Sequence, residues 1–335
     1  MKGFKEFGVA MTGVFPVFEA VELAKSAEKL GLGSVWFAED YFFRGVVPYM
    51  AAAAMETQRI KVGLGVINCY SRHPALIAME FATLDEMLKG RGIYGLGSGV
   101  PYWMTQMGYD MTKPLSRTRE CVDLINKIMS FESITYDGQF FIARDIKLIF
   151  EPVRKKVPIF LAFEGKMGLK LCGEIADGAI LSVFNTPSYV KFAIDRFNKG
   201  AKKAKRSLDD FEIVAYLPMV IDDDLDKAIS IARDFVKLYF PVSSPDSPLM
   251  NHAGITSKNV TEFKEAAQKG EDVGALITDK MVQATAVVGS VETCIKHIQG
   301  ILDAGANTPV LFPVPGTDPV QTCETLSKEI APHLR

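Results

Sequence analysis

Residues 61–99 constrain the fold most, because two short apolar segments there flank an amphipathic helical pattern. The segments at residues 60–66 and 93–96 are apolar and punctuated by glycine, which is typical of buried parallel strands. Between them, apolar residues recur at helical spacing after Pro74, and a run of basic residues and glycine at 89–92 ends the pattern. A β-α-β unit of this kind joins parallel strands through a right-handed crossover, so the stretch predicts an α/β fold.

The same alternation of strand and helix continues along the whole chain. Strands are predicted at residues 7–11, 34–37, 60–66, 93–96, 157–162, 178–182, 211–219 and 308–312. Over 335 residues, eight such strands favour a (β/α)8 TIM barrel with insertions, folded as a single domain over residues 1–335. A doubly wound open sheet is the alternative, but the sequence lacks the early GxGxxG turn that such a fold would carry.

Three segments interrupt the regular alternation. Residues 133–142 form two alternating runs around Asp137-Gly138, which predicts a hairpin on the barrel rim. Residues 102–113 are interpreted as a loop. Residues 241–280 are rich in proline, serine, glycine and charge, which predicts a long irregular insertion with one short helix near residues 260–269.

Charge and cysteine usage narrow the functional classes. A formal net charge of −2 argues against a nucleic-acid-binding surface. The five cysteines show no CxxC spacing and no neighbouring histidine cluster, so we expect neither structural zinc nor disulfides. The N-terminal residues lack the apolar run of a signal peptide, and no stretch of about twenty apolar residues follows. We therefore expect a cytoplasmic protein that binds no membrane.

In a TIM barrel the ligand site forms at the carboxyl ends of the strands, so the residues after each strand are the candidates. These segments are rich in glycine and small polar residues, and of the four histidines only His73 lies near them. A metal site and a serine or cysteine nucleophile with a histidine base are therefore disfavoured. The glycines instead suit a flat cofactor, because a ring can lie close to a backbone that carries no side chain.

Two carboxylates after the second strand are the candidates for catalysis. Glu39 and Asp40 would serve the cofactor or move a proton. The alternative is that they form salt bridges at the barrel mouth with Arg44 or Arg72. His73, which precedes Pro74, is interpreted as a helix-capping residue.

A second candidate feature is the start of the helix after the fifth strand. Glu164, Gly165 and Lys166 open this helix, where free N–H groups, the helix dipole and the lysine charge favour an anion such as phosphate. The alternative for Glu164 is a helix cap or a carboxylate on the barrel rim.

Three motifs resemble the bacterial-luciferase-like superfamily of flavin and deazaflavin oxidoreductases. They are Tyr70-Ser71-Arg72-His73-Pro74, Thr83-Leu84-Asp85-Glu86 and Gly173-Glu174-Ile175-Ala176-Asp177-Gly178. The resemblance extends in outline over nearly all of the chain. Within the superfamily the sequence is most similar to the coenzyme F420-dependent branch, in particular to the methylenetetrahydromethanopterin reductases.

The resemblance implies an oxidoreductase that transfers a hydride between F420 and a small organic substrate. It implies a cofactor ring in the barrel mouth, a non-prolyl cis peptide at a bulge between Gly65 and Val66, phosphate near Glu164, and a homodimer or homotetramer. The cofactor-binding residues expected from the strand ends and the resemblance are Gly65, Val66, Asn68, Gly97, Ser98, Glu164, Gly165 and Lys166. FMN is the alternative cofactor. The alternative functions are an FMN-dependent monooxygenase and a non-catalytic flavin-binding barrel.

Three positions depart from the patterns of the F420-dependent branch. Asp40 stands where the sugar-phosphate and alcohol dehydrogenases of the branch carry histidine. The methanopterin reductases have an aspartate at the position of Val100 and a carboxylate at the position of Ala10 or Met11. The resemblance therefore leaves the substrate open.

Overall fold

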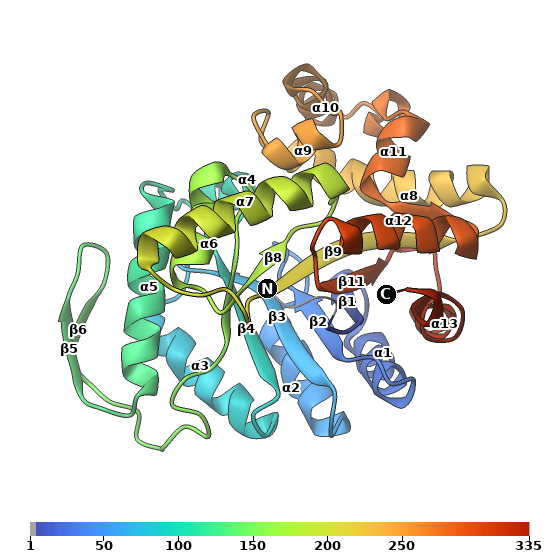
Figure 1. Cartoon of the computed structure of the whole chain (residues 1–335). Helices are drawn as coiled ribbons and strands as arrows, with labels where there is room; N and C mark the ends of the chain where they lie inside the picture. The colour runs from blue at the N-terminus through green and yellow to red at the C-terminus, as the bar shows by residue number, and fades with distance from the viewer. Residues whose placement is uncertain (1–4, 335) are drawn as a thin grey trace.

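Eight parallel strands close into a barrel in the computed structural model, which describes residues 5–334 (Figure 1). In chain order they are β1 (Gly8–Thr12), β2 (Ser34–Ala38), β3 (Lys61–Asn68), β4 (Gly92–Gly97), β7 (Ile159–Ala162), β8 (Gly178–Leu181), β9 (Glu212–Ile221) and β11 (Thr308–Pro313). Each strand pairs in parallel with the next in this order, and β11 pairs with β1 to close the ring. The predicted (β/α)8 TIM barrel and its eight strands are confirmed.

Helices surround the barrel. They are α1 (Val17–Lys29), α2 (Val46–Glu56), α3 (Pro74–Met87), α5 (Pro114–Met129), α6 (Lys166–Ile175), α7 (Pro187–Ala204), α8 (Leu225–Tyr239), α12 (Val291–Asp303) and α13 (Pro319–Thr325), followed by η3 (Leu326–Ile330) and η4 (Ala331–His333). Helix α3 shows how they form: the His73 ring accepts a hydrogen bond from the backbone of Ala75, and Pro74 occupies the first turn. Its side chains Ile77 and Phe81 are buried against the strands. The capping role expected for His73 is confirmed.

Large aromatic side chains fill the barrel interior. The Trp36 ring lies 6.1 Å from the Phe160 ring and 6.2 Å from the Tyr216 ring, and Tyr216 also contacts Phe312. Gly63 on β3 leaves room for the indole of Trp36, because a Cβ atom there would collide with it. The barrel interior is therefore a packed core, as in other TIM barrels, whose ligand sites form at the carboxyl ends of the strands.

The predicted rim hairpin is confirmed. Strands β5 (Ile134–Asp137) and β6 (Ile142–Ile146) pair antiparallel and project from the barrel beside α5 (Figure 1). The Glu120 carboxylate of α5 accepts hydrogen bonds from the backbone N–H groups of residues 139–141, which ties the turn of the hairpin to the barrel.

Two segments expected to be irregular contain more helix than predicted. Residues 241–280 and their flanks hold η1 (Phe240–Val242), α9 (Pro248–His252), α10 (Ser257–Lys269), η2 (Val273–Leu276) and α11 (Asp279–Thr285). Each of the last four starts at a side-chain cap, such as the capping box of Thr256 and Asn259, so short local signals outweighed the mixed composition. The loop expected at 102–113 is likewise wrong at its start, where α4 (Pro101–Gln106) begins with a proline in its first turn.

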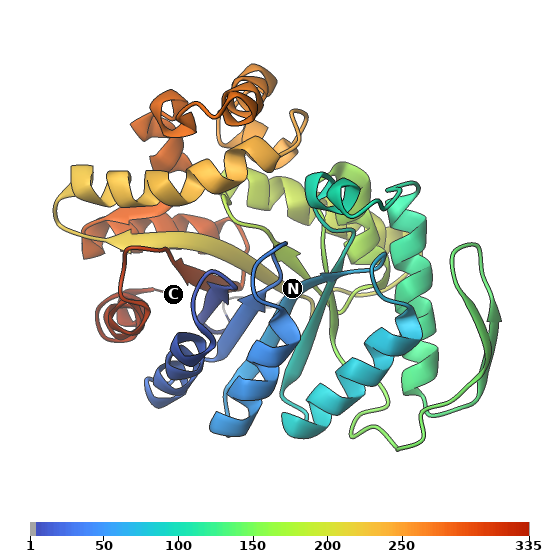
Figure 2. The same ribbon diagram turned by 180° about the vertical axis from the view of Figure 1, so that it is seen from behind.

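The additional helices gather on one side of the barrel. Both views show α9, α10 and α11 beside α8 (Figures 1 and 2). A short strand, β10 (Val287–Gly289), extends the sheet beside β9 and was not predicted. Among residues 5–334, no helix combines the length and the apolar character needed to cross a membrane.

Candidate active site

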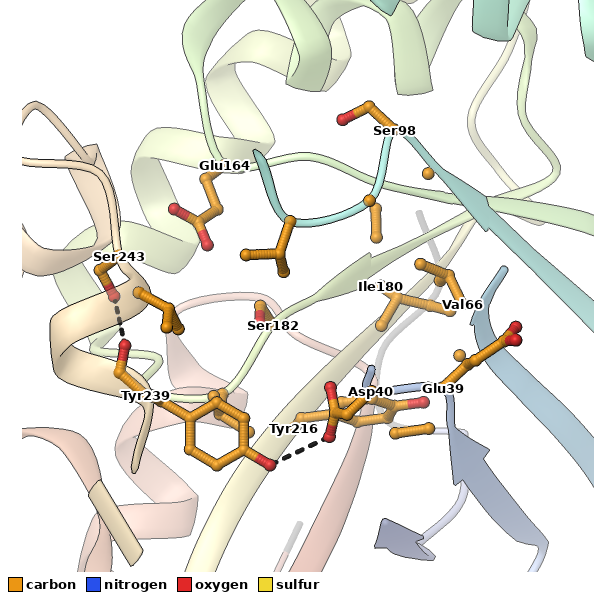
Figure 3. A pocket seen from close by; sticks show the side chains of 18 of the residues that line it. Glu39, Asp40, Val66, Ser98, Glu164, Ile180, Ser182, Tyr216, Tyr239 and Ser243 are labelled. Atoms are coloured by element: carbon orange, nitrogen blue, oxygen red, sulfur yellow. Dashed lines mark hydrogen bonds between the residues drawn. The ribbon is translucent and has the colours of Figure 1, made fainter. Parts of the chain in front are cut away.

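A cavity of about 330 Å³ lies at the carboxyl ends of the barrel strands (Figure 3). Its volume falls in the range of small-molecule sites, about 300–1,000 Å³. Strand ends supply most of the wall, and the segment after α8 supplies the rest with Val242, Ser243, Ser244 and Leu249. The insertion therefore completes a cavity that the barrel alone leaves open.

Asp40 is a half-buried carboxyl in this cavity without a cationic partner among the described residues. It follows β2, and its Oδ2 accepts a hydrogen bond from the Tyr239 hydroxyl at 3.0 Å. Burial raises the pKa of Asp40 to about 6, the hydrogen bond from Tyr239 works against this rise, and the charge of Glu39 adds to it. A carboxyl group with this pKa can hold or release a proton near neutral pH.

Glu39 lies beside Asp40 but in a different environment. Its side chain is 7% exposed, and the Arg72 guanidinium lies 3.4 Å from Oε1. Burial raises the pKa of Glu39, while Arg72 opposes the rise. The ion pair with Arg72 that was weighed as an alternative is thus present, whereas Arg44 binds the backbone carbonyls of residues 13 and 14 instead.

Glu164 is the third carboxyl in the cavity. It follows β7, and its Oε2 accepts a hydrogen bond from the Ser247 hydroxyl at 2.7 Å. Burial raises the pKa of Glu164, and Ser247 partly offsets this effect. Glu164 is not the cap of α6, because Gly165 takes that position. Gly165 and Lys166 are exposed at the start of α6 and do not line the cavity.

Backbone forms much of the cavity floor. Gly65, Val66, Gly97 and Ser98, all expected to bind the cofactor, line the cavity. The peptide bond between Gly65 and Val66 is cis, and the register between β3 and β4 shifts here, as the resemblance implied. A second cis bond, between Tyr41 and Phe42, was not predicted. A side chain at position 65 would collide with the Tyr216 hydroxyl, so this floor stays flat only with glycine.

Asn68, also expected to bind the cofactor, does not line the cavity. Its side chain is 1% exposed, and Oδ1 accepts hydrogen bonds from the backbone of Tyr70 at 2.8 Å and of Ser71 at 2.7 Å. Its Nδ2 group donates to the hydroxyl groups of Ser71 and Tyr41. Asn68 therefore shapes the loop after β3 and holds Tyr41, which does line the cavity.

Several residues of the cavity were not singled out from the sequence. Tyr216 on β9 has a buried hydroxyl without a hydrogen-bond partner in the described chain. Tyr239 and Ser243 line the cavity, and Ser247 donates to the lining residue Glu164. All three come from the segment after β9, more than 190 residues beyond Asp40. Of these residues, Tyr216 alone could have been predicted from the sequence, because the alternation of side chains along a strand indicates which residues point into the barrel. Trp103, which lies in the segment expected to be a loop, lines the cavity and contacts the Tyr41 ring edge to face at 6.1 Å.

The charge of the cavity has one sign. Glu39, Asp40 and Glu164 are its acidic lining residues, and the described lining residues include no lysine, arginine or histidine. Across residues 5–334, histidine, cysteine and carboxylate side chains also do not gather in groups of three that could hold a metal ion. The cavity thus combines a flat glycine floor, three acids and an aromatic wall.

The comparisons with known proteins agree with this geometry. The profile described as luciferase-like monooxygenase matches residues 4–308. The 5,10-methylenetetrahydromethanopterin reductase of Archaeoglobus fulgidus is 31% identical, covering 98% of this chain and 100% of the relative, and that of Methanolobus tindarius is 32% identical, covering 97% and 99%. The solved coenzyme F420-dependent tetrahydromethanopterin reductase of Methanopyrus kandleri superposes with a TM-score of 0.89 at 27% identity, covering 99% of this chain and 100% of that one.

Proposed function

Because this chain belongs to the luciferase-like monooxygenase family, we propose that it is an oxidoreductase that uses coenzyme F420 to transfer a hydride to or from a small organic substrate. The observation that carries the proposal is the cavity floor, where the register shift between β3 and β4 and the glycines at positions 65 and 97 leave a surface without large side chains. The same site is where the resemblance sets one face of the cofactor ring. The F420-dependent relatives named above support the choice of cofactor.

The residues of the cavity fit a planar ring with a polar tail. Gly65, Val66, Gly97 and Ser98 would hold the ring against the floor, and the buried Tyr216 hydroxyl lies directly beneath this floor. The exposed start of α6 at Gly165 and Lys166 would bind the phosphate of the tail, because free N–H groups and the helix dipole favour an anion there. When bound, F420 supplies the hydride-transfer chemistry.

The protein's own contribution to the reaction is binding, exclusion of water and control of a proton. Hydride addition to a C=O or C=N bond places an electron pair on the heteroatom, which then needs a proton. Asp40 can deliver this proton, because its pKa of about 6 keeps part of the carboxyl protonated near neutral pH. Glu39 is the second candidate for a catalytic role, and Arg72 keeps its charge compensated.

The charge of the cavity restricts the substrate class. Arg72 compensates Glu39, but Asp40 and Glu164 have no cationic partner in the described chain, and together they would repel a phosphate or carboxylate at the reacting end of the substrate. We therefore propose a substrate that is neutral or cationic at its reacting end. A 5,10-methylenetetrahydropterin, the substrate type in the names of the two relatives, is the first candidate. Glucose 6-phosphate is the negative probe, because it would bring a doubly charged phosphate into the same acidic cavity.

The decisive experiment is a titration of the purified protein with F420 and, separately, with FMN. We expect the absorption and fluorescence of F420 to report saturable binding with a dissociation constant well below that of FMN. Reduced F420 should then be oxidised on addition of the 5,10-methylenetetrahydropterin, which accepts the hydride. Oxidised F420 should not be reduced on addition of glucose 6-phosphate, which can only donate a hydride. Tight FMN binding with oxygen consumption, and no binding of F420, would instead establish the FMN-dependent monooxygenase.

We further propose that the protein is a homodimer or homotetramer and acts in the cytoplasm. The five cysteines are buried free thiols, a state that a reducing compartment maintains. The expectations of no membrane and no nucleic-acid partner stay predictions.

A further inference from the structure

The contact between Tyr239 and Asp40 joins two elements that are far apart in the sequence. Tyr239 is the last residue of α8, and Asp40 lies in the loop after β2. The Tyr239 hydroxyl donates a hydrogen bond to Asp40 Oδ2 at 3.0 Å, as the dashed line in Figure 3 shows. No other pair of described side chains links α8 to this loop by a hydrogen bond, so the contact is a property of the tertiary structure alone.

The phenol ring of Tyr239 packs against two aromatic rings, and its backbone is held by a third contact. The Phe235 ring lies 5.0 Å away, and the Phe184 ring meets it edge to face at 6.3 Å. The backbone carbonyl of Tyr239 accepts a hydrogen bond from the Ser243 hydroxyl at 3.0 Å. With its ring and backbone both packed, the hydroxyl presents a fixed donor to Asp40 rather than a mobile one.

The Tyr239 hydroxyl is the hydrogen-bond donor to the Asp40 carboxyl, whereas the neighbouring Glu39 carboxyl is paired with a cation. The titratable groups that face Asp40 are Glu39 from its own segment, Tyr216 from β9 and Tyr239 from α8. Arg72 compensates Glu39, but no described cation reaches Asp40. Of the three groups that face Asp40, only Tyr239 donates a hydrogen bond to its carboxyl.

We propose that Tyr239 is a positioning residue for Asp40, whose hydroxyl orients the carboxyl group and sets its proton affinity for transfer to the substrate. The inference deepens the function proposed above and rests on it. A neutral donor suits this task. An arginine at the same place would keep the carboxylate ionised, and an apolar residue would keep it protonated. With Oδ2 engaged by Tyr239, the other oxygen stays available to the substrate.

The central test is Tyr239→Phe, which removes only the hydroxyl. In the reductive direction Asp40 must be protonated, so kcat/KM of the wild type should fall as pH rises through about 6. Loss of a donor to the carboxylate raises its pKa, so this limb should move to higher pH by about one pH unit in the variant. The dependence of kcat/KM on pH, measured with reduced F420, gives the position of this limb.

A second readout does not need the cofactor. Infrared difference spectroscopy of the protein alone, with Asp40→Asn to assign the protonated carboxyl band, gives the pKa of Asp40 directly. Tyr239→Phe should raise this midpoint by the same amount as it moves the kinetic limb. Should Tyr239→Phe fail to fold, 3-fluorotyrosine at position 239 keeps the hydroxyl, donates more strongly, and should move the midpoint to lower pH.

Tyr49→Phe is the matched control. The Tyr49 phenol is also buried and donates to a backbone carbonyl, that of Phe15, but it does not line the cavity. The Tyr49→Phe substitution should lower the melting temperature and leave the titration midpoint of Asp40 unchanged. A lower melting temperature in Tyr239→Phe with an unchanged midpoint would overturn the inference. A shifted midpoint together with no F420-linked turnover by the wild type would uphold the positioning contact and refute the proposed function.

Discussion

At the scale of single residues, two neighbouring carboxyl groups differ because their tertiary partners differ. Glu39 has a guanidinium beside it, whereas Asp40 has only the Tyr239 hydroxyl and the nearby charge of Glu39. The sequence could name both as candidates, but it could not rank them. We propose Asp40 rather than Glu39 as the proton donor, because no described cation pairs with Asp40 and its pKa is raised to about 6.

Asp40→Asn should abolish proton transfer while keeping the shape of the side chain. We expect kcat/KM to fall by about 10²–10⁴-fold, the usual contribution of a general acid. The dissociation constant of F420 should change much less, since Asn can still accept a hydrogen bond from Tyr239. Steady-state kinetics and a binding titration on the same preparation distinguish an effect on kcat/KM from an effect on F420 binding. A variant that retains wild-type kcat/KM would contradict the role of Asp40.

The same substitution should affect stability in a pH-dependent way. Burial raises the pKa of Asp40 from its ordinary 3.8 to about 6, so the folded protein binds the proton more tightly than the unfolded chain does. The buried carboxyl therefore does not lower the free energy of unfolding below about pH 3.8, where it is protonated in both states. It lowers that free energy progressively as pH rises to about 6. Relative to wild type, Asp40→Asn should gain melting temperature between pH 4 and pH 7. A difference that is independent of pH would show that Asp40 is not desolvated as described.

At the scale of elements, an ion pair between a buried carboxylate and a partly exposed arginine joins three parts of the barrel wall. Asp85 of α3 is fully buried, and Arg154, from the loop before β7, contacts it through two nitrogens, with Nε at 2.9 Å from Oδ2. Arg154 also donates to the carbonyl of Gly92 on β4 at 2.8 Å, and the Tyr94 hydroxyl donates to Asp85. Asp85 belongs to a motif that carried the family resemblance, and its position here is structural.

Arg154→Met should therefore destabilise the protein strongly. Removal of the guanidinium leaves the Asp85 carboxylate buried without its cation, which typically costs about 3–5 kcal/mol. Lys155→Met is the matched control, because the neighbouring Lys155 pairs with Glu151 at the exposed surface, 3.3 Å apart, and its loss should stay within about 0.5 kcal/mol. Equilibrium urea unfolding measures both. Equal effects of the two substitutions would rule out the bridging role of Arg154.

At the scale of the whole molecule, the resemblance predicts an assembly of two or four chains. One chain has a mass of 36.9 kDa, so light scattering should give two or four times this value. The large apolar side chains exposed on α2 and α3, namely Met55, Leu76 and Met79, offer a surface that association would cover. Light scattering coupled to size exclusion at several concentrations makes the measurement, and a mass of one chain throughout would contradict the prediction.

The barrel could be predicted from the sequence because its signals are local. Eight apolar strands, the helices between them and the hairpin at residues 133–142 each follow from the periodicity and turn residues of a short stretch. The glycine floor at Gly65 and Gly97 followed from the strand ends, since a TIM barrel brings all of them to one mouth. The sequence predicted too few helices in the insertion, because each helix there is marked only by a short capping motif within a stretch of mixed composition.

What only the tertiary structure decided is which polar groups face one another across the mouth. The sequence determined that Asp40 and Glu164 end strands of the same barrel and therefore share a cavity. The folded chain decided that Tyr239, at the end of α8, and Ser247, in the insertion, donate to these two carboxyls, and that Asn68 turns away from the cavity to hold a loop. The reason is physical: periodicity reports the burial of a residue within its own element, whereas a hydrogen bond between segments up to 199 residues apart depends on how α8 and the insertion pack over the barrel.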